Sequence, residues 1–152
     1  MGLIVQKCGG TSVADAGCIR GVAGIITDTY KKGNQVVAVL SAQGDTTDDL
    51  IAMAGQINPR ASSREMDMLL SSGEQISAAL LAMAIERMGY PVVSLLGWQA
   101  GFDTSSDYGN ARIKRVDPSR IKQELDKRRI VVVTGFQGVN SYGHMTHLGR
   151  GG

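Results

Sequence analysis

The stretch LIVQKCGGTSV, residues 3–13, determines how the rest of the chain is interpreted. An apolar run that suits a short β-strand leads into Lys7 and then into Gly9 and Gly10, just before a helical pattern begins. Glycine has no Cβ, so backbone N–H groups in such a turn can approach anionic oxygens closely. The following helix N-terminus adds partial positive charge, and Lys7 adds a full one. The stretch therefore predicts a phosphate-binding turn.

The order of residues in this turn excludes two common phosphate-binding motifs. The Walker motif places its lysine after the glycines, and the dinucleotide fingerprint requires G-x-G-x-x-G. Here Lys7 precedes the glycine pair, and neither pattern is present in residues 3–13. The turn therefore represents a different phosphate-binding arrangement.

Strand-like and helical patterns alternate along the chain. Apolar runs typical of strands occupy residues 3–6, 36–40, 92–96 and 130–134. Helical spacing of apolar residues separates most of them, first over about residues 13–31 and then from Thr46 to just before Pro59. Parallel strands need such long crossover connections. The sequence predicts an α/β fold with an open, mainly parallel sheet and flanking helices.

The later elements are marked by capping and turn residues. Ser62 followed by Glu65 forms a capping box that predicts a helix start. We expect Gly73 to interrupt that helix before its apolar stripe resumes as far as residue 85. Asp117 as N-cap and Pro118 as first helical residue predict a helix over residues 118–127. Residues 140–143 predict a turn between two short strands.

Composition and charge favour a soluble protein. The 152 residues include 16 basic and 14 acidic side chains, for a formal net charge of +2, and residues 127–129 form the longest basic run. This balance gives no support for binding of nucleic acid or an anionic membrane. The two cysteines form no C-x-x-C pair, which argues against a metal or disulfide framework. With no secretory leader and no apolar run near ~18–20 residues, we expect a cytoplasmic protein.

The motif Lys-x-Gly-Gly-Thr-Ser-Val at residues 7–13 resembles the start of aspartokinases, which belong to the amino-acid kinase family. The resemblance covers essentially the whole chain, because six further blocks follow in the family's order. These blocks occupy residues 41–48, 72–75, 97–101, 109–113, 133–136 and 148–152. The resemblance implies the N-terminal half of the amino-acid kinase fold. Residues 1–152 are then a partial domain that binds amino acid and phosphate, with the nucleotide half and regulatory domains absent.

The activity implied by this resemblance is phosphorylation of the β-carboxylate of L-aspartate by ATP. The product is 4-phospho-L-aspartate, the entry to lysine, threonine and methionine synthesis. The implied cosubstrate is ATP with Mg²⁺, and the full-length form is a possible homo-oligomer. Acetylglutamate, glutamate-5 and uridylate kinases share the fold, but they lack the combined blocks at residues 7–13 and 72–75.

The resemblance also assigns roles at the phosphate turn. Lys7 lies against the transferring phosphoryl group as the catalytic cation. The backbone around Cys8, Gly9 and Gly10 cradles phosphate oxygens together with Lys7. Phosphoryl transfer to a carboxylate joins two anions, so neutralisation and positioning are the main requirements. No protein ligand set for a metal is expected.

Other residues match the family's amino-acid site. Glu74 corresponds to the partner of the substrate ammonium, and its place in an apolar helix makes burial without a cation expensive. Arg150 corresponds to the partner of the α-carboxylate, which a guanidinium can bind through two hydrogen bonds. The remaining substrate-binding positions implied by the resemblance are Ser41, Thr47, Phe136, Gly151 and Gly152.

Three positions depart from the family pattern. Cys8 stands where an aromatic residue is usual, Tyr108 replaces a usual histidine, and His147 replaces a threonine before the 148–152 block. The last change puts the shape of that loop in question. Two alternatives to an active kinase remain at this point. One is a catalytically inactive fragment that at most binds aspartate, and the other is a structural subunit that pairs with a full-length kinase.

Overall fold

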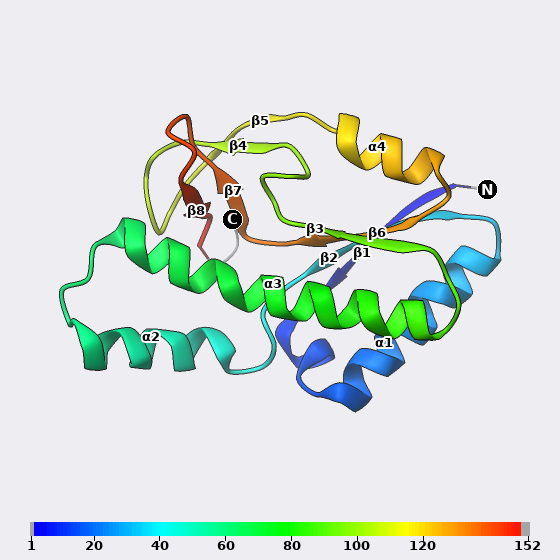
Figure 1. Cartoon of the computed structure of the whole chain (residues 1–152), viewed down its shortest axis with the longest axis horizontal. Coiled ribbons are helices and arrows are strands. Elements are labelled where there is room, and N and C mark those ends of the chain that lie inside the picture. Colours follow the sequence, from blue (N-terminus) through cyan, green and yellow to red (C-terminus); the bar gives the residue numbers. More distant parts are fainter. Residues whose placement is uncertain (1, 150–152) are drawn as a thin grey trace.

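The computed structural model describes residues 2–149 and contains a parallel sheet, called sheet A (Figure 1). Its strands lie in the order β1-β2-β6-β3, and every neighbouring pair is parallel. The apolar runs of the sequence predicted all four strands, and β6 was predicted with its correct bounds. The strands are β1 (Leu3–Cys8), β2 (Gln35–Leu40), β3 (Val92–Leu95) and β6 (Ile130–Thr134).

The first helical region begins later than expected. Residues Gly10–Val13 form the short 3-10 helix η1, and α1 (Ala16–Lys31) starts after it. Asp15 sets this start, because its side chain accepts a hydrogen bond from the Cys18 backbone N–H at 2.8 Å. The expected start near residue 13 is therefore wrong, whereas the expected end at residue 31 is confirmed. Helix α2 (Thr46–Ile57) ends before Pro59, as predicted.

The long helix α3 (Ser63–Arg87) is capped as predicted but is not interrupted. The Ser62 side chain accepts a hydrogen bond from the Glu65 N–H. Helix α3 continues through Gly73, which corrects the expected break. A Cβ at Gly73 would lie 2.9 Å from the Cβ of Ala42, so glycine allows close packing there. Tertiary contact therefore outweighs the low helix propensity of glycine.

The last helix, α4 (Ser119–Asp126), differs from its prediction by one position. Its N-cap is Pro118, not Asp117, and the first helical residue is Ser119. The Asp117 carboxylate instead accepts hydrogen bonds from both the backbone N–H and the hydroxyl of Ser119. Asp117 thus still satisfies a donor at the helix start, from one residue further out.

A second sheet, sheet B, was predicted only in part. Its order is β5-β4-β7-β8, with antiparallel β4–β5 and β7–β8 pairs and a parallel β4–β7 pair. The turn at residues 140–143 joins β7 to β8, as expected, but β4 and β5 were not predicted. The bounds are β4 (Phe102–Thr104), β5 (Ile113–Val116), β7 (Gln137–Val139) and β8 (Met145–His147).

Helices cover the two faces of sheet A unequally (Figure 1). Helices α1 and α3 pack on one face, and α4 lies on the other with Phe102 of β4. The first core cluster includes side chains that alternate along the strands, such as Val36 and Ala38. Their neighbours Val37 and Val39 face the other way, as the two-residue period of a strand requires.

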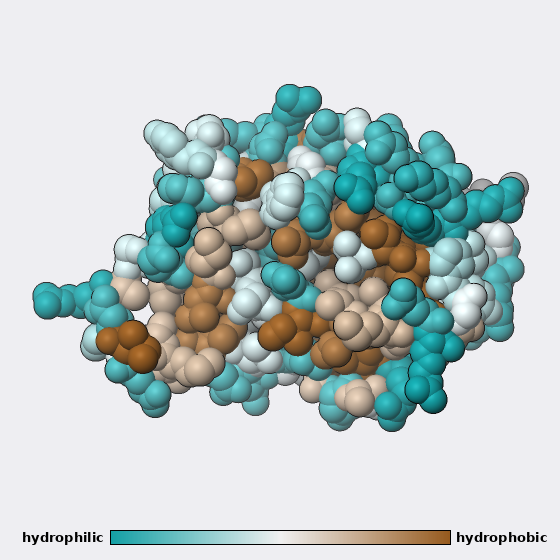
Figure 2. Space-filling model, viewed as in Figure 1, coloured by the Kyte–Doolittle hydropathy of each residue, from teal (hydrophilic) through white to brown (hydrophobic). Residues whose placement is uncertain are grey.

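Helix α3 also corrects the expectation about apolar segments. Among the described residues, it is the one helix long and apolar enough, by length and composition, to cross a membrane. Its buried residues include Asp67 and Glu74, and it packs against both sheets. The core helix of a soluble protein can have the same length and composition, so these two properties are weak evidence for a membrane span. Figure 2 shows apolar areas over α2 and α3, where exposed side chains include Ile51, Met53, Ile57, Met68, Ile76 and Met83.

Candidate functional site

Lys7 lies near the carboxyl end of β1, on the face of sheet A that α4 partly covers. Side chains alternate along the strand, so Lys7 shares this face with Leu3 and Val5. Cys8 points the other way, into the core beneath α1 and α3, and this burial raises the pKa of its thiol. Only the backbone of Cys8 is therefore placed to serve the turn, and its carbonyl accepts the Ser41 N–H at 3.0 Å.

The glycine turn is tied to the loop that follows β2. The Gly10 carbonyl accepts the Gly44 N–H at 2.9 Å, and the Gly9 carbonyl accepts the Ser12 N–H at 3.1 Å. A Cβ at Gly10 would lie 3.0 Å from the Ala42 carbonyl oxygen, so this position is crowded. A Cβ at Gly9 would meet nothing within 4 Å. The open space beside Gly9 can accommodate an anionic oxygen close to the backbone.

Three predicted site residues line one hollow of about 470 Å³ on this face of sheet A. Lys7, Ser41 and Phe136 come from the ends of β1, β2 and β6. Ligands of open α/β sheets bind beyond the carboxyl ends of the strands, where these residues lie. The rest of the lining consists mostly of apolar side chains of β1, β2 and α4. It also includes Thr134, Gly135, Gln137 and Leu148.

Phe136 is held in an unusual backbone conformation. Its φ is 63°, a left-handed value that a non-glycine residue rarely adopts. Its carbonyl accepts the Leu148 N–H at 2.7 Å, and its ring stacks on that of His147 with 6.0 Å between centroids. The Lys7 Nζ lies 5.2 Å from the Phe136 ring centroid, within cation–π range. The aromatic ring therefore links the cation of β1 to the polar cluster described next.

Glu74 lies behind the hollow and is 2% exposed. Its Oε1 accepts a hydrogen bond from Gln137 Nε2 at 3.0 Å and lies 3.6 Å from His147 Nε2. Gln137 also donates to the Ser71 carbonyl at 3.1 Å, and it lines the hollow. Gln137 therefore connects the buried carboxylate to the hollow. Gln137 was not predicted from the sequence. The one feature that could have indicated it is its position as a polar residue directly after Gly135-Phe136 at the end of a strand.

Asp67 is a second buried carboxylate that sequence reasoning missed. It is 0% exposed, and its Oδ2 accepts the backbone N–H groups of Gly109 and His147, each at 2.9 Å. These bonds attach sheet B to the N-terminal half of α3. The available signal was its position seven residues before Glu74, which places both carboxylates on one face of the helix.

The comparison with protein families identifies the fold. A model of the amino acid kinase family matches residues 2–152. The chain belongs to the amino acid kinase family. It is 55% identical over 152 residues to an aspartokinase of Geobacillus stearothermophilus, and 53% identical over 153 residues to one of Corynebacterium glutamicum. Each alignment covers all of this chain but only 37% and 36% of the relative, so the chain spans about a third of their length.

Solved structures agree with this assignment. Aspartate kinase from Synechocystis superposes with a TM-score of 0.83 at 43% identity, covering 99% of this chain and 24% of that one. Aspartokinase III of Escherichia coli, crystallised with aspartate and ADP, gives a TM-score of 0.86 at 21% identity over 99% of this chain and 44% of that one. At this lower identity, the second likeness supports the fold alone.

Four further predicted substrate-binding residues of this amino acid kinase are Thr47, Arg150, Gly151 and Gly152. Thr47 lies in the first turn of α2, partly buried, and is not among the described residues that line the hollow. Arg150, Gly151 and Gly152 lie outside the described residues. Within residues 2–149, no group of three or more His, Cys, Asp or Glu side chains could hold a metal ion.

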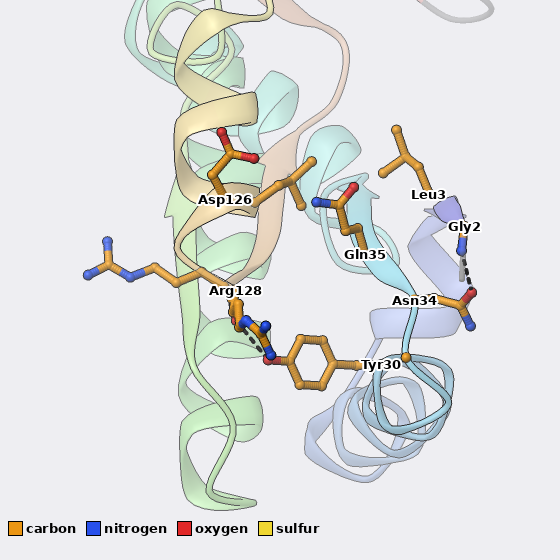
Figure 3. Close-up of a pocket in the computed structure, with 10 residues that line it drawn as sticks. Gly2, Leu3, Tyr30, Asn34, Gln35, Asp126 and Arg128 are labelled. Atoms are coloured by element: carbon orange, nitrogen blue, oxygen red, sulfur yellow. Dashed lines mark hydrogen bonds between the residues drawn. The ribbon is translucent and has the colours of Figure 1, made fainter.

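A larger hollow of about 700 Å³ lies at the amino ends of β1 and β2, away from the Lys7 turn (Figure 3). Several of its polar side chains are already bonded within the chain. Asn34 accepts from the Gly2 N–H and donates to the Thr29 carbonyl, and the Tyr30 hydroxyl donates to the Arg128 carbonyl. These contacts engage the Asn34 and Tyr30 side chains within the fold.

Proposed function

We propose that this chain supplies the amino-acid and phosphate site of an aspartate kinase. The proposed reaction transfers the γ-phosphoryl group of ATP to the β-carboxylate of L-aspartate, giving 4-phospho-L-aspartate and ADP for lysine, threonine and methionine synthesis. The observation that carries the proposal is the convergence of Lys7, Ser41 and Phe136 on one hollow, with the buried Glu74 behind it. The similarity to aspartokinases selects this substrate.

Lys7 would neutralise part of the negative charge on the reacting groups. The attacking carboxylate and the transferring phosphoryl group are both anionic, so their approach requires a nearby cation. Lys7 is exposed at the hollow, and its Nζ lies over the Phe136 ring rather than in an ion pair with a described carboxylate. The backbone at Gly9 and Gly10 would hold phosphate oxygens beside it.

Recognition of the amino acid rests on groups of opposite charge at its two ends. Glu74 would bind the ammonium, and Arg150 the α-carboxylate. The hydroxyls of Ser41 and Thr47 would hold the substrate from the β2–α2 side. Phe136 would cover it, and Gly151 and Gly152 belong to the same proposed substrate-binding set. A buried carboxylate such as Glu74 gains most from a cationic ligand, because water does not compete for it.

Mg-ATP supplies the phosphoryl group when it is bound. Lys7 and the backbone of Cys8, Gly9 and Gly10 are the residues that fit its phosphate end, because the open space beside Gly9 admits an anionic oxygen. The proposed enzyme is cytoplasmic and homo-oligomeric in its full-length form.

A second candidate is a chain that binds L-aspartate without catalysing its phosphorylation. Both candidates predict binding of L-aspartate, and they differ in turnover of ATP.

One experiment separates the two candidates. The 152-residue chain is assayed beside a chimera in which it replaces the matching part of the Geobacillus aspartokinase. A coupled ADP assay measures turnover, and calorimetry measures binding of L-aspartate. We expect both proteins to bind L-aspartate and only the chimera to turn over. Absence of turnover in a folded chimera would contradict the kinase proposal.

Within the active chimera, Lys7→Ala tests the catalytic assignment. We predict a fall in kcat of about 10²–10³, because one preorganised electrostatic group is removed, with little change in affinity for L-aspartate. Lys32→Ala, an exposed lysine at the end of α1, is the matched control and should retain the parent rate. A parent-like kcat in Lys7→Ala would remove Lys7 from the mechanism.

A further inference from the structure

The His147 side chain is fixed on two sides within the site. Its Nδ1 accepts the Gly149 N–H at 3.3 Å, and its ring stacks on Phe136 with 13° between the planes. A neutral imidazole has one donor and one acceptor nitrogen. Because Nδ1 is the acceptor, the ring proton lies on Nε2.

That Nε2–H group faces Glu74. The distance from Nε2 to Glu74 Oε1 is 3.6 Å, slightly longer than a hydrogen bond. Nε2 is buried and has no hydrogen-bond partner among residues 2–149. An unpaired buried donor is unfavourable, and a small shift toward Oε1 would satisfy it. Gln137 Nε2 already donates to the same oxygen.

We propose that His147 is a positioning residue for Glu74, an inference that rests on the proposed function. With Gln137 and His147 both directed at Oε1, the carboxylate plane is fixed and Oε2 is the oxygen presented to the substrate ammonium. The backbone N–H of His147 is itself held by Asp67, so the imidazole is anchored from α3 as well as from Phe136. His147 thereby links the ammonium-binding carboxylate to the aromatic ring beside Lys7.

The contact itself can be tested without a ligand. In ¹⁵N spectra of the histidine side chains of the 152-residue chain, we expect His147 in its Nε2–H form. We also expect Glu74→Gln to shift the Nε2 signal of His147 while leaving that of His144 unchanged, because His144 bonds to Tyr108 instead. An Nδ1–H form of His147, or a signal insensitive to Glu74→Gln, would overturn the proposal.

Two variants test the consequence for binding. His147→Gln can place an amide N–H near the position of Nε2, whereas His147→Asn reaches only the position of Nδ1. We expect His147→Asn to weaken L-aspartate binding about tenfold and His147→Gln to restore most of it, since a hydrogen bond to a charged group is lost and regained. Calorimetry on both variants and the parent chain, with thermal melts as a check on folding, measures this difference.

Succinate distinguishes positioning from general damage, because it carries both carboxylates of aspartate but no ammonium. The affinity for succinate should be the same in the parent and in His147→Asn. An equal loss for both ligands, or no loss for L-aspartate, would contradict the positioning role. If the parent chain binds no L-aspartate, the proposed function fails for this chain, and the imidazole spectra still decide the His147–Glu74 contact.

Discussion

Sheet A and sheet B are held together by different forces. Every residue of the inner strand β6 is buried, and an apolar core cluster packs against each face of sheet A. Sheet B has strands of three or four residues that depend on polar contacts, such as the buried hydroxyl pair of Thr104 and Thr146 and the Asp67 bonds to Gly109 and His147. Apolar burial thus forms the scaffold, whereas specific hydrogen bonds place the candidate site.

The largest effect is expected from removing apolar volume beneath sheet A. Ile130 in β6 is 0% exposed, and Ile130→Ala should lower the free energy of unfolding by about 2–5 kcal/mol. Ile57→Ala is the control, because Ile57 is 87% exposed and should change stability by less than about 0.5 kcal/mol. Urea unfolding followed by circular dichroism measures both. Similar losses in the two variants would show that burial does not distinguish them.

An intermediate effect is expected where sheet B is attached to α3. Asp67→Asn keeps the shape but removes the charge from two buried hydrogen bonds, and it should lower stability by about 1–3 kcal/mol. Hydrogen exchange should speed up at the Gly109 and His147 amides and stay slow at Val132 in β6. An equal increase in the exchange rate of amides in both sheets would contradict the view that Asp67 stabilises sheet B specifically.

The smallest effect is expected at Glu124, a buried residue of α4. A hydrogen bond from Arg129, with help from Lys127 and Arg120, lowers the pKa of Glu124 from its ordinary value of 4.5. A folded-state pKa below the unfolded value stabilises the fold above pH 4.5, and this contribution is lost as the pH falls through the folded-state pKa.

Glu124→Gln should therefore destabilise the chain at pH 7 more than at pH 3. Urea unfolding of the parent chain and the variant at the two pH values measures the difference. Glu86→Gln, at an exposed position on α3, serves as the control. Its effect on the free energy of unfolding should be the same at pH 7 and at pH 3. If the stability difference between the parent chain and Glu124→Gln is the same at pH 7 and pH 3, the ion pair between Glu124 and Arg129 does not stabilise the fold.

The contrast between the sheets also explains what could be predicted from sequence. Continuous apolar runs revealed the strands of sheet A. Such runs are typical of the inner strands β2 and β6, which are largely buried on both faces. Strands β4 and β5 were missed because they are short and β5 is exposed along its whole length. The helix break expected at Gly73 was wrong because this glycine is explained by close packing against Ala42, which is distant in the sequence.

The candidate site divides in the same way. Lys7, Ser41, Glu74 and Phe136 were recognised from local motifs, and the structure gathers Lys7, Ser41 and Phe136 around the hollow with Glu74 buried behind it. The supporting contacts were not recognisable, because Gln137 reaches Glu74 across 63 positions and Asp67 reaches the His147 amide across 80. Pairings of that kind depend on the completed fold and leave little trace in the local pattern.

The uninterrupted course of α3 has a mechanical consequence. Its 25 residues form a rod of about 37 Å at 1.5 Å per residue. One half of this rod bears sheet B through Asp67, and the other half packs under sheet A through residues such as Leu81 and Ile85. A rod that tilts moves least at its centre, and Glu74 lies near the centre. Rocking of the two sheets would therefore displace the Glu74 carboxylate less than the groups at the two ends of α3.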